Sequence, residues 1–243
     1  MRLLVANWKM NKSYNDGLKT LQNVSKTIKN SSKKRYIILS PIQSTLYIKD
    51  NLAKKDVFFG SQDCSKYNNG PFTGDISAEM IKKIGCTYVL IGHSERRKLY
   101  LENSKVLFEK IKRASEQKLK IIFCVGERLS DYRKKKSIQF IIKQLLEVFD
   151  KKTNFKNIIL AYEPIWAIGS NITPKLQEID SIHCKIKKTI QEKFNFTNIP
   201  ILYGGSVKAS NSAKIFSLKN VDGGLIGGAS LIASEFCKIY DTL

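Results

Sequence analysis

Short apolar runs rich in β-branched residues alternate along the chain with longer stretches in which apolar residues recur every three or four positions. The runs have the length and composition of buried strands. There are eight, at residues 3–6, 36–39, 57–59, 88–91, 121–125, 158–162, 199–203 and 221–226. The longer stretches predict covering helices, and one of them carries Ile179, Ile182, Ile186 and Ile190. Eight strand and helix units of roughly 30 residues nearly exhaust the chain, so the pattern predicts an α/β protein whose residues 1–243 form a single closed (β/α)8 barrel domain.

A doubly wound open sheet also alternates strands and helices. It is disfavoured because no G-x-G-x-x-G sequence follows the first run. In a barrel, chemistry lies where the strands end and the following loops begin. The predicted strand ends carry Asn7, Lys9, His93, Glu95, Glu163, Ser206 and two glycine pairs, Gly204-Gly205 and Gly227-Gly228. These are the candidate site residues.

The stretch AYEPIWAIGSNITP, residues 161–174, follows the sixth run. Pro164 cannot donate to a sheet ladder, so the strand ends there and Glu163 lies at its carboxyl end. An apolar segment lies between Pro164 and Pro174, and its tip is formed by Gly169, Ser170 and Asn171. This composition is typical of a lid that excludes water from a site. The alternative is a loop that fills a hydrophobic gap while Glu163 points to solvent.

Two further side chains could complete a site with Glu163. His93 is followed by Ser94-Glu95-Arg96-Arg97, which could open a short helix whose positive amino end disfavours the imidazolium form. A neutral imidazole could then donate a hydrogen bond to a carbonyl oxygen. Lys9 would need a partner inside a barrel mouth, and Glu95 is the candidate. The second histidine, His183, lies within a helical stretch and is interpreted as structural.

The glycine pairs after the seventh and eighth runs would let backbone N–H groups approach an anion, and loops at these two positions bind phosphate in many barrels. A tight turn would explain either pair alone. A carboxylate base, a neutral histidine, a fixed cation and a phosphate cradle under a lid together describe proton abstraction next to a carbonyl. The sequence therefore predicts aldose–ketose isomerisation of a phosphorylated substrate.

Composition limits the compartment and the partners. The five cysteines are odd in number and form no C-x-x-C pair, which argues against a disulfide framework and a zinc site and favours a reducing compartment. We find no signal peptide and no apolar run long enough to span a membrane, so we expect a soluble, cytoplasmic protein without a membrane partner. The net charge of +21 leaves open an alternative function, a basic surface that binds nucleic acid or anionic lipid. The basic runs are spread over the predicted helices without a recognition motif, so specific nucleic-acid binding is not expected.

Seven motifs, in order along the chain, resemble the triosephosphate isomerase family, whose fold is the TIM barrel. They are NWKMN from Asn7, GPFTGDIS from Gly70, IGHSERR from Ile91, CVGE from Cys124, AYEPIWAIG from Ala161, YGGSV from Tyr203 and GGASL from Gly227. The resemblance spans nearly the full chain. It implies interconversion of dihydroxyacetone phosphate and D-glyceraldehyde 3-phosphate, a step of glycolysis and gluconeogenesis, through an enediolate and without cofactor or metal.

The resemblance also implies a role for each candidate residue. Glu163 would be the base and neutral His93 the electrophile, which is the known division of roles in this family. Asn7 and Lys9 would bind and orient the substrate, with Glu95 holding Lys9. Tyr203 would latch the closed lid, and the phosphate would lie on backbone N–H groups of Gly169, Ser206, Gly227 and Gly228.

Members of the family are homodimers in which a long loop after the third strand reaches into the partner's site. The loop from Gln62 to Ser77 resembles it, with Thr73 near the tip. Asp75 departs from the family pattern, since a Glu usually forms an intersubunit pair with the residue matching Arg96. Such a screened pair is worth only about 0 to 1 kcal/mol, so a homodimer is expected regardless.

Two more departures lie in loops. Asn171 stands where other short lids have a glycine, and Asn tolerates a positive φ better than most residues, so the tip is expected to turn. Pro71 stands where Ala is usual and is expected to stiffen the dimer loop.

Overall fold

The computed structural model describes residues 1–53, 56–169 and 172–243. In this part of the chain eight parallel strands close into one barrel, in which each strand pairs with the next and β1 pairs with β8. The strands are β1 (Arg2–Asn7), β2 (Lys34–Leu39), β3 (Phe58–Ser61), β4 (Tyr88–Ile91), β5 (Lys120–Val125), β6 (Ile158–Tyr162), β7 (Ile201–Tyr203) and β8 (Gly223–Ile226). The predicted (β/α)8 barrel is confirmed, and the open-sheet alternative is wrong.

The predicted strand bounds agree with the structure within two residues, and the differences have local causes. β7 begins at Ile201 because Pro200, directly before it, has no N–H for the ladder. β8 begins at Gly223, which has a φ of +147°. A Cβ on this residue would lie 1.8 Å from the carbonyl oxygen of Leu3. The glycine therefore lets β8 approach β1 closely enough to close the barrel.

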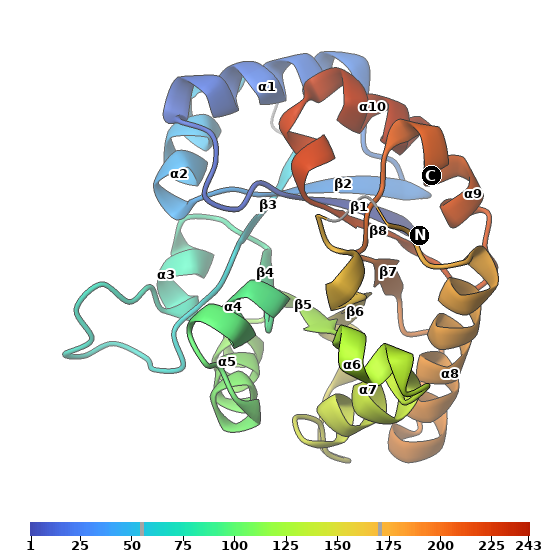
Figure 1. The fold of residues 1–243 in the computed structure, drawn as a ribbon. Coiled ribbons are helices and arrows are strands. Elements are labelled where there is room, and N and C mark those ends of the chain that lie inside the picture. Colours follow the sequence, from blue (N-terminus) through green and yellow to red (C-terminus); the bar gives the residue numbers. More distant parts are fainter. Residues whose placement is uncertain (54–55, 170–171) are drawn as a thin grey trace.

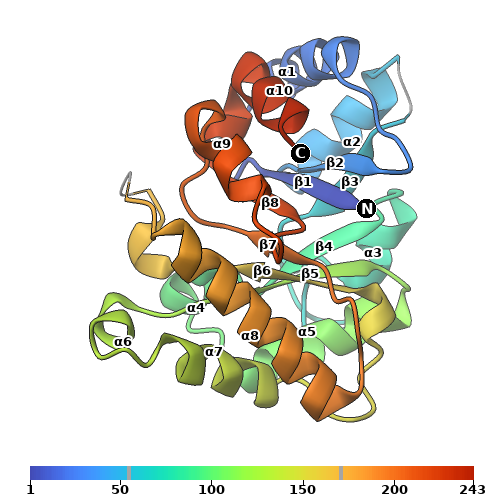
Figure 2. The ribbon, with the colours of Figure 1, turned by 90° about the vertical axis from the view of Figure 1, so that its right-hand side faces the viewer.

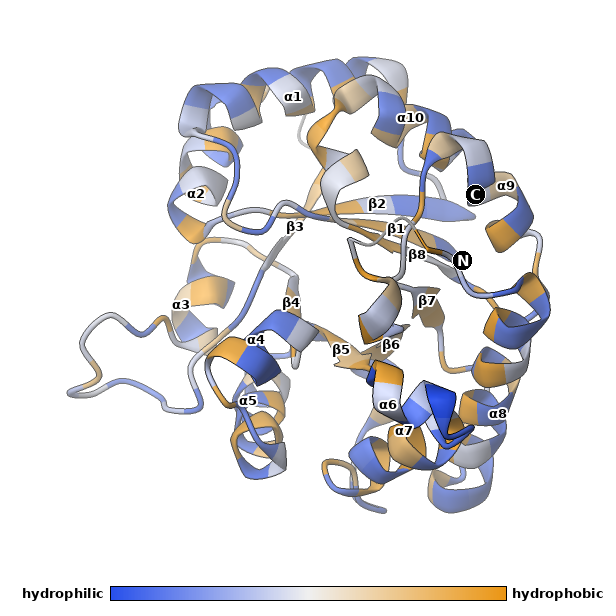
Figure 3. Ribbon diagram, viewed as in Figure 1, coloured by the Kyte–Doolittle hydropathy of each residue, from blue (hydrophilic) through white to orange (hydrophobic). Residues whose placement is uncertain are grey.

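Helices lie outside the barrel between successive strands (Figures 1 and 2). They are α1 (Tyr14–Thr27), α2 (Ile42–Asn51), α3 (Ala78–Lys83), α4 (Ser94–Leu99), α5 (Ser104–Glu116), α6 (Leu129–Arg133), α7 (Ser137–Leu146), α8 (Leu176–Phe194), α9 (Ala209–Phe216) and α10 (Ala233–Asp241), with short 3-10 turns η1 (Phe155–Asn157), η2 (Ile165–Ala167) and η3 (Gly228–Leu231). Ser13 and Asn103 begin α1 and α5 by accepting backbone N–H groups. Hydrophobic and hydrophilic residues alternate along the helices (Figure 3), as expected for one buried face. No helix in the described ranges is long and apolar enough to cross a membrane.

The strands separate two buried clusters. Successive side chains of a strand point to opposite faces of the sheet. Those on the inner face, such as Leu3 and Val5 of β1, fill the inside of the barrel. Those on the outer face, such as Leu4 and Ala6, pack against the helices. Because both faces of a strand are buried, the strand runs are almost continuously apolar in the sequence.

Candidate active site

Glu163 lies directly after β6, and its side chain is buried. The residue is 2% exposed, and its backbone N–H donates to the carbonyl of Val125 at 2.8 Å. Carboxylate Oε1 lies 3.1 Å from Nε2 of His93, and Oε2 accepts the N–H of Ser94 at 3.1 Å. The alternative in which Glu163 points to solvent is therefore wrong.

His93 caps the amino end of α4, the short helix predicted to open after it. Its Nδ1 accepts the backbone N–H of Glu95 at 3.3 Å, so the proton of a neutral ring lies on Nε2, which faces Glu163. Burial alone would lower the pKa of His93, but the adjacent Glu163 carboxylate outweighs it and the pKa is raised. Burial would raise the pKa of Glu163, but contact with His93 lowers it. In this arrangement the Glu163 carboxylate is held ionised. Its charge raises the pKa of His93, whereas the positive amino end of α4 was expected from the sequence to lower it.

Lys9 extends from the loop after β1 toward Glu95, with Nζ 2.5 Å from Oε1. Its backbone is left-handed, with a φ of 51°, which costs a non-glycine residue about 1 to 3 kcal/mol. Two side chains hold this backbone: Asn7 accepts the N–H of Lys9 at 3.1 Å, and Gln62 donates to its carbonyl at 2.8 Å. The expected contact between Lys9 and Glu95 is present, and Gln62 is a supporting residue that the sequence did not reveal.

A cavity of about 410 Å³ at the carboxyl ends of the strands brings most of the candidate residues together. Its lining includes Asn7, Lys9, His93, Glu163, Gly169, Ser206, Gly227 and Gly228. Ile168 lines it as well. A Cβ on Gly228 would meet no heavy atom within 4 Å, so there is open space over this backbone. Ser170 and Asn171, predicted at the lid tip, lie outside the described residues.

Two candidates contribute from outside this cavity. Glu95 lines a larger neighbouring cavity and reaches the site through Lys9. Tyr203 is fully buried beneath the turn that follows β7, where a Cβ on Gly205 would lie 2.2 Å from its hydroxyl oxygen. Burial raises the pKa of Tyr203, so the phenol keeps its proton. Its hydroxyl has no hydrogen-bond partner among the described residues.

The chemical groups in the cavity fit an anionic carbonyl compound. They are a carboxylate, an imidazole N–H, an ammonium group and glycine-rich backbone. No group of three or more His, Cys, Asp or Glu side chains within the described ranges is arranged to hold a metal ion.

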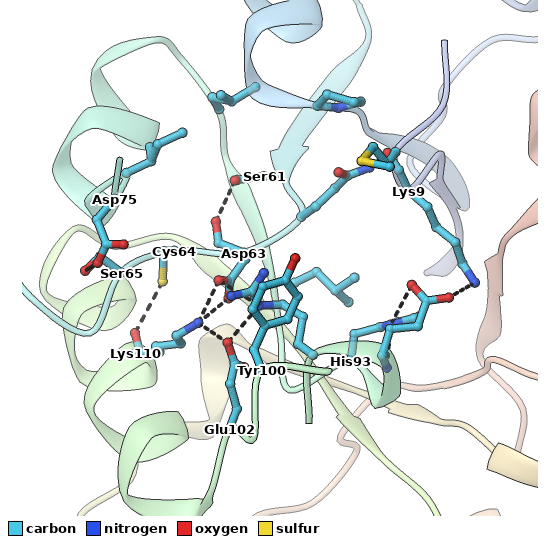
Figure 4. Close-up of a pocket in the computed structure, with 18 of the residues that line it drawn as sticks. Lys9, Ser61, Asp63, Cys64, Ser65, Asp75, His93, Tyr100, Glu102 and Lys110 are labelled. Carbon is cyan, nitrogen blue, oxygen red and sulfur yellow. Dashed lines mark hydrogen bonds and ion pairs between the residues drawn. The ribbon is translucent and has the colours of Figure 1, made fainter. Parts of the chain in front are cut away.

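The neighbouring cavity, of about 970 Å³, is bounded by a cluster of four charged side chains, two of them buried and two half-buried (Figure 4). Lys110 Nζ lies 2.6 Å from a carboxylate oxygen of Asp63 and 2.6 Å from one of Glu102. Arg96 Nε lies 2.9 and 2.7 Å from the same two carboxylates. The cluster ties the loop after β3 to α4 and α5, next to Glu95. The sequence did not reveal it, because Asp63 and Lys110 are 47 positions apart and form no motif.

The loop from Gln62 to Ser77 extends from the barrel between β3 and α3 (Figure 1). Within it the rings of Tyr67 and Phe72 stack with centroids 3.8 Å apart. Asp75 accepts a hydrogen bond from Ser65 at 2.5 Å. These contacts give the loop a defined shape within a single chain.

Comparisons with known proteins identify the family. The family model described as triosephosphate isomerase matches residues 2–243. The triosephosphate isomerase of Francisella philomiragia is 37% identical, over 99% of this chain and 96% of its own length, and that of Hahella chejuensis is 37% identical, over 99% and 97%. A crystal structure of triosephosphate isomerase from Bartonella henselae matches with a TM-score of 0.90 and 34% identity, over 99% of this chain and 98% of that one. This chain belongs to the triosephosphate isomerase family.

Proposed function

We propose that this protein interconverts dihydroxyacetone phosphate and D-glyceraldehyde 3-phosphate through an enediolate, without a cofactor. The proposal rests on Glu163 and His93, a buried carboxylate and an imidazole nitrogen 3.1 Å apart at the mouth of the barrel. A carbonyl substrate lying against both would present a carbon-bound proton to the carboxylate and its oxygens to the Nε2–H group.

Glu163 would take a proton from one substrate carbon and return it to the next. Before a substrate enters, contact with His93 lowers the pKa of this carboxyl, so Glu163 meets the substrate as the ionised base. Neutral His93 would donate its Nε2 proton in a hydrogen bond to the substrate oxygens and stabilise the enediolate. A substrate that separates Glu163 from the ring would remove the contact that raises the pKa of His93.

The remaining candidates would bind the substrate. Asn7 and Lys9 would orient it and balance its charge, with Glu95 fixing Lys9. The phosphate would lie on backbone N–H groups of the glycine-rich loops, at Gly169, Ser206, Gly227 and Gly228.

The segment after Glu163 would act as a lid. Ile168 lines the same cavity, so closure would remove water from the enediolate. The Tyr203 hydroxyl, which has no partner among the described residues, would latch the closed segment.

We also propose a homodimer in which the loop from Gln62 to Ser77 enters the larger cavity of a second copy. Lys9 and Glu95 line that cavity. Apolar side chains that line it are exposed in the single chain, with Met10 at 96% and Tyr100 at 66%. A partner loop would cover them and order the Lys9–Glu95 pair. Light scattering should give a mass near twice 27.7 kDa, whereas the mass of a single chain would contradict the dimer.

The whole chain, residues 1–243, would act as one domain in a reducing cytoplasm. Four of its five free cysteines are buried and Cys184 is exposed, an arrangement suited to that compartment. There the reaction would serve glycolysis and gluconeogenesis.

A coupled assay of D-glyceraldehyde 3-phosphate conversion tests the function. The wild-type protein should turn over rapidly, and Glu163→Gln, which keeps the shape but cannot act as a base, should be slower by about 10² to 10⁴-fold. The proposal fails if folded wild-type protein shows no turnover, and the assignment of the base fails if both proteins are equally fast.

A further inference from the structure

Near the start of the segment that follows Glu163, a tryptophan is held by two contacts. Trp166 lies in η2, and its Nε1–H donates to Glu127 Oε1 at 2.8 Å. Its ring stacks on Tyr132 of α6, with centroids 4.2 Å apart and an interplanar angle of 29°. Glu127 therefore fixes the edge of the indole and Tyr132 fixes its face.

The same tyrosine also contacts the far end of the segment. Its hydroxyl donates to Oε1 of Glu178, near the amino end of α8, over 3.4 Å. Oε2 of Glu178 accepts the backbone N–H of Lys175, directly after Pro174, at 3.1 Å. One side chain of α6 thus contacts the start of the segment and, through Glu178, its end.

The surroundings of Tyr132 are otherwise solvated. The next four residues along the chain are basic and exposed, Arg133, Lys134, Lys135 and Lys136. Tyr132 is only partly exposed and turns back onto Trp166. Ile168 and Gly169, two and three positions beyond Trp166, line the candidate active site. The position of Trp166 therefore decides where Ile168 and Gly169 would contact a substrate.

We propose that Tyr132 is a positioning residue for this reaction. Through Trp166 and Glu178 it sets both ends of the segment that brings Ile168 and Gly169 to the glycine-rich side of the cavity. The inference rests on the proposed isomerase function. Tyr132 does not touch the reacting atoms. It acts through a segment that is proposed to bind the phosphate at Gly169 and to cover the cavity at Ile168 once the phosphate is bound, so its effect should fall on a substrate that carries a phosphate group.

The test compares two substrates in three variants. Tyr132→Leu removes the stacked ring, and Tyr132→Phe keeps the ring but removes the hydroxyl. Phe108→Leu, at an exposed position of α5, controls for the loss of a surface aromatic side chain. For each protein kcat/KM is measured with D-glyceraldehyde 3-phosphate and with D-glyceraldehyde, which lacks the phosphate.

Tyr132→Leu should lower kcat/KM for the phosphorylated substrate by about two- to tenfold, the range that one aromatic stack supplies, and leave kcat/KM for D-glyceraldehyde unchanged. Tyr132→Phe, which keeps the stack on Trp166 and loses the contact with Glu178, should show a smaller loss than Tyr132→Leu on the phosphorylated substrate. Phe108→Leu should alter kcat/KM for neither substrate. Equal losses on both substrates would indicate general damage and overturn the proposal, as would a fully active Tyr132→Leu. A wild-type protein inactive on both substrates would instead overturn the proposed function, and the inference with it.

Discussion

Replacing Gly204 by alanine tests how tightly the turn after β7 fixes the Glu163 carboxylate. The φ of Gly204 is not positive, so its backbone accepts alanine and the perturbation is the added methyl group. A Cβ on Gly204 would lie 2.9 Å from Cγ of Glu163, whereas ordinary contacts begin at 3.4 Å, so the carboxylate must retreat by about 0.5 Å. A misplacement of about 1 Å costs on the order of a hundredfold in rate, so half that distance should lower kcat about tenfold.

Steady-state kinetics with D-glyceraldehyde 3-phosphate measure the effect. KM should change little, because the added methyl group meets Glu163 and the carbonyl of Tyr162 and not the glycine-rich loop after β8. A melting temperature close to that of the wild type would show that the barrel is intact. If kcat of Gly204→Ala equalled that of the wild type, the claim that this turn sets the position of the base would be refuted.

Two further predictions concern stability. Burial lowers the pKa of His183 to about 3, so below pH 6.5 the unfolded chain binds a proton that the folded chain does not. The free energy of unfolding should therefore fall with acidification, by up to about 1.4 kcal/mol per pH unit from this residue. Urea titrations from pH 7 to 5 should show that the free energy of unfolding depends less steeply on pH in His183→Gln than in the wild type. An equal dependence on pH in the two proteins would contradict this. Lys110→Met leaves the carboxylates of Asp63 and Glu102 with Arg96 as their one remaining cation in the cluster and should lower the free energy of unfolding by about 3 kcal/mol. Lys83→Met, at a side chain 74% exposed, should cost less than about 1 kcal/mol, and a similar loss in both variants would show that burial is not the cause.

The barrel and the main chemical groups could be predicted from the sequence because each has a local signal. Strands buried on both faces are continuously apolar, and the apolar runs at residues 88–91 and 158–162 match β4 and β6 at both bounds. Pro164 ends β6 and so places Glu163 at its carboxyl end. Similarly, the polar run after β4 put His93 at the start of a helix, where the structure has it.

Other features depend on contacts between residues far apart in the sequence. The stack of Tyr132 on Trp166 and the charge cluster around Lys110 have no signature in either segment alone. The direction of the pKa shift of His93 depends on a 3.1 Å contact with Glu163, 70 positions away along the chain, so reasoning from the end of α4 alone gave the opposite direction.

Deuterium incorporation tests most directly the central claim that Glu163 moves a proton between two substrate carbons. The isomerisation of D-glyceraldehyde 3-phosphate is run in D2O and the product is analysed by proton NMR. A carboxyl group that holds the abstracted proton can exchange it with solvent, so part of the wild-type product should carry deuterium on the carbon that receives the proton, and Glu163→Gln should form almost no product. Product entirely free of deuterium, or deuterated product formed at the wild-type rate by Glu163→Gln, would contradict the account.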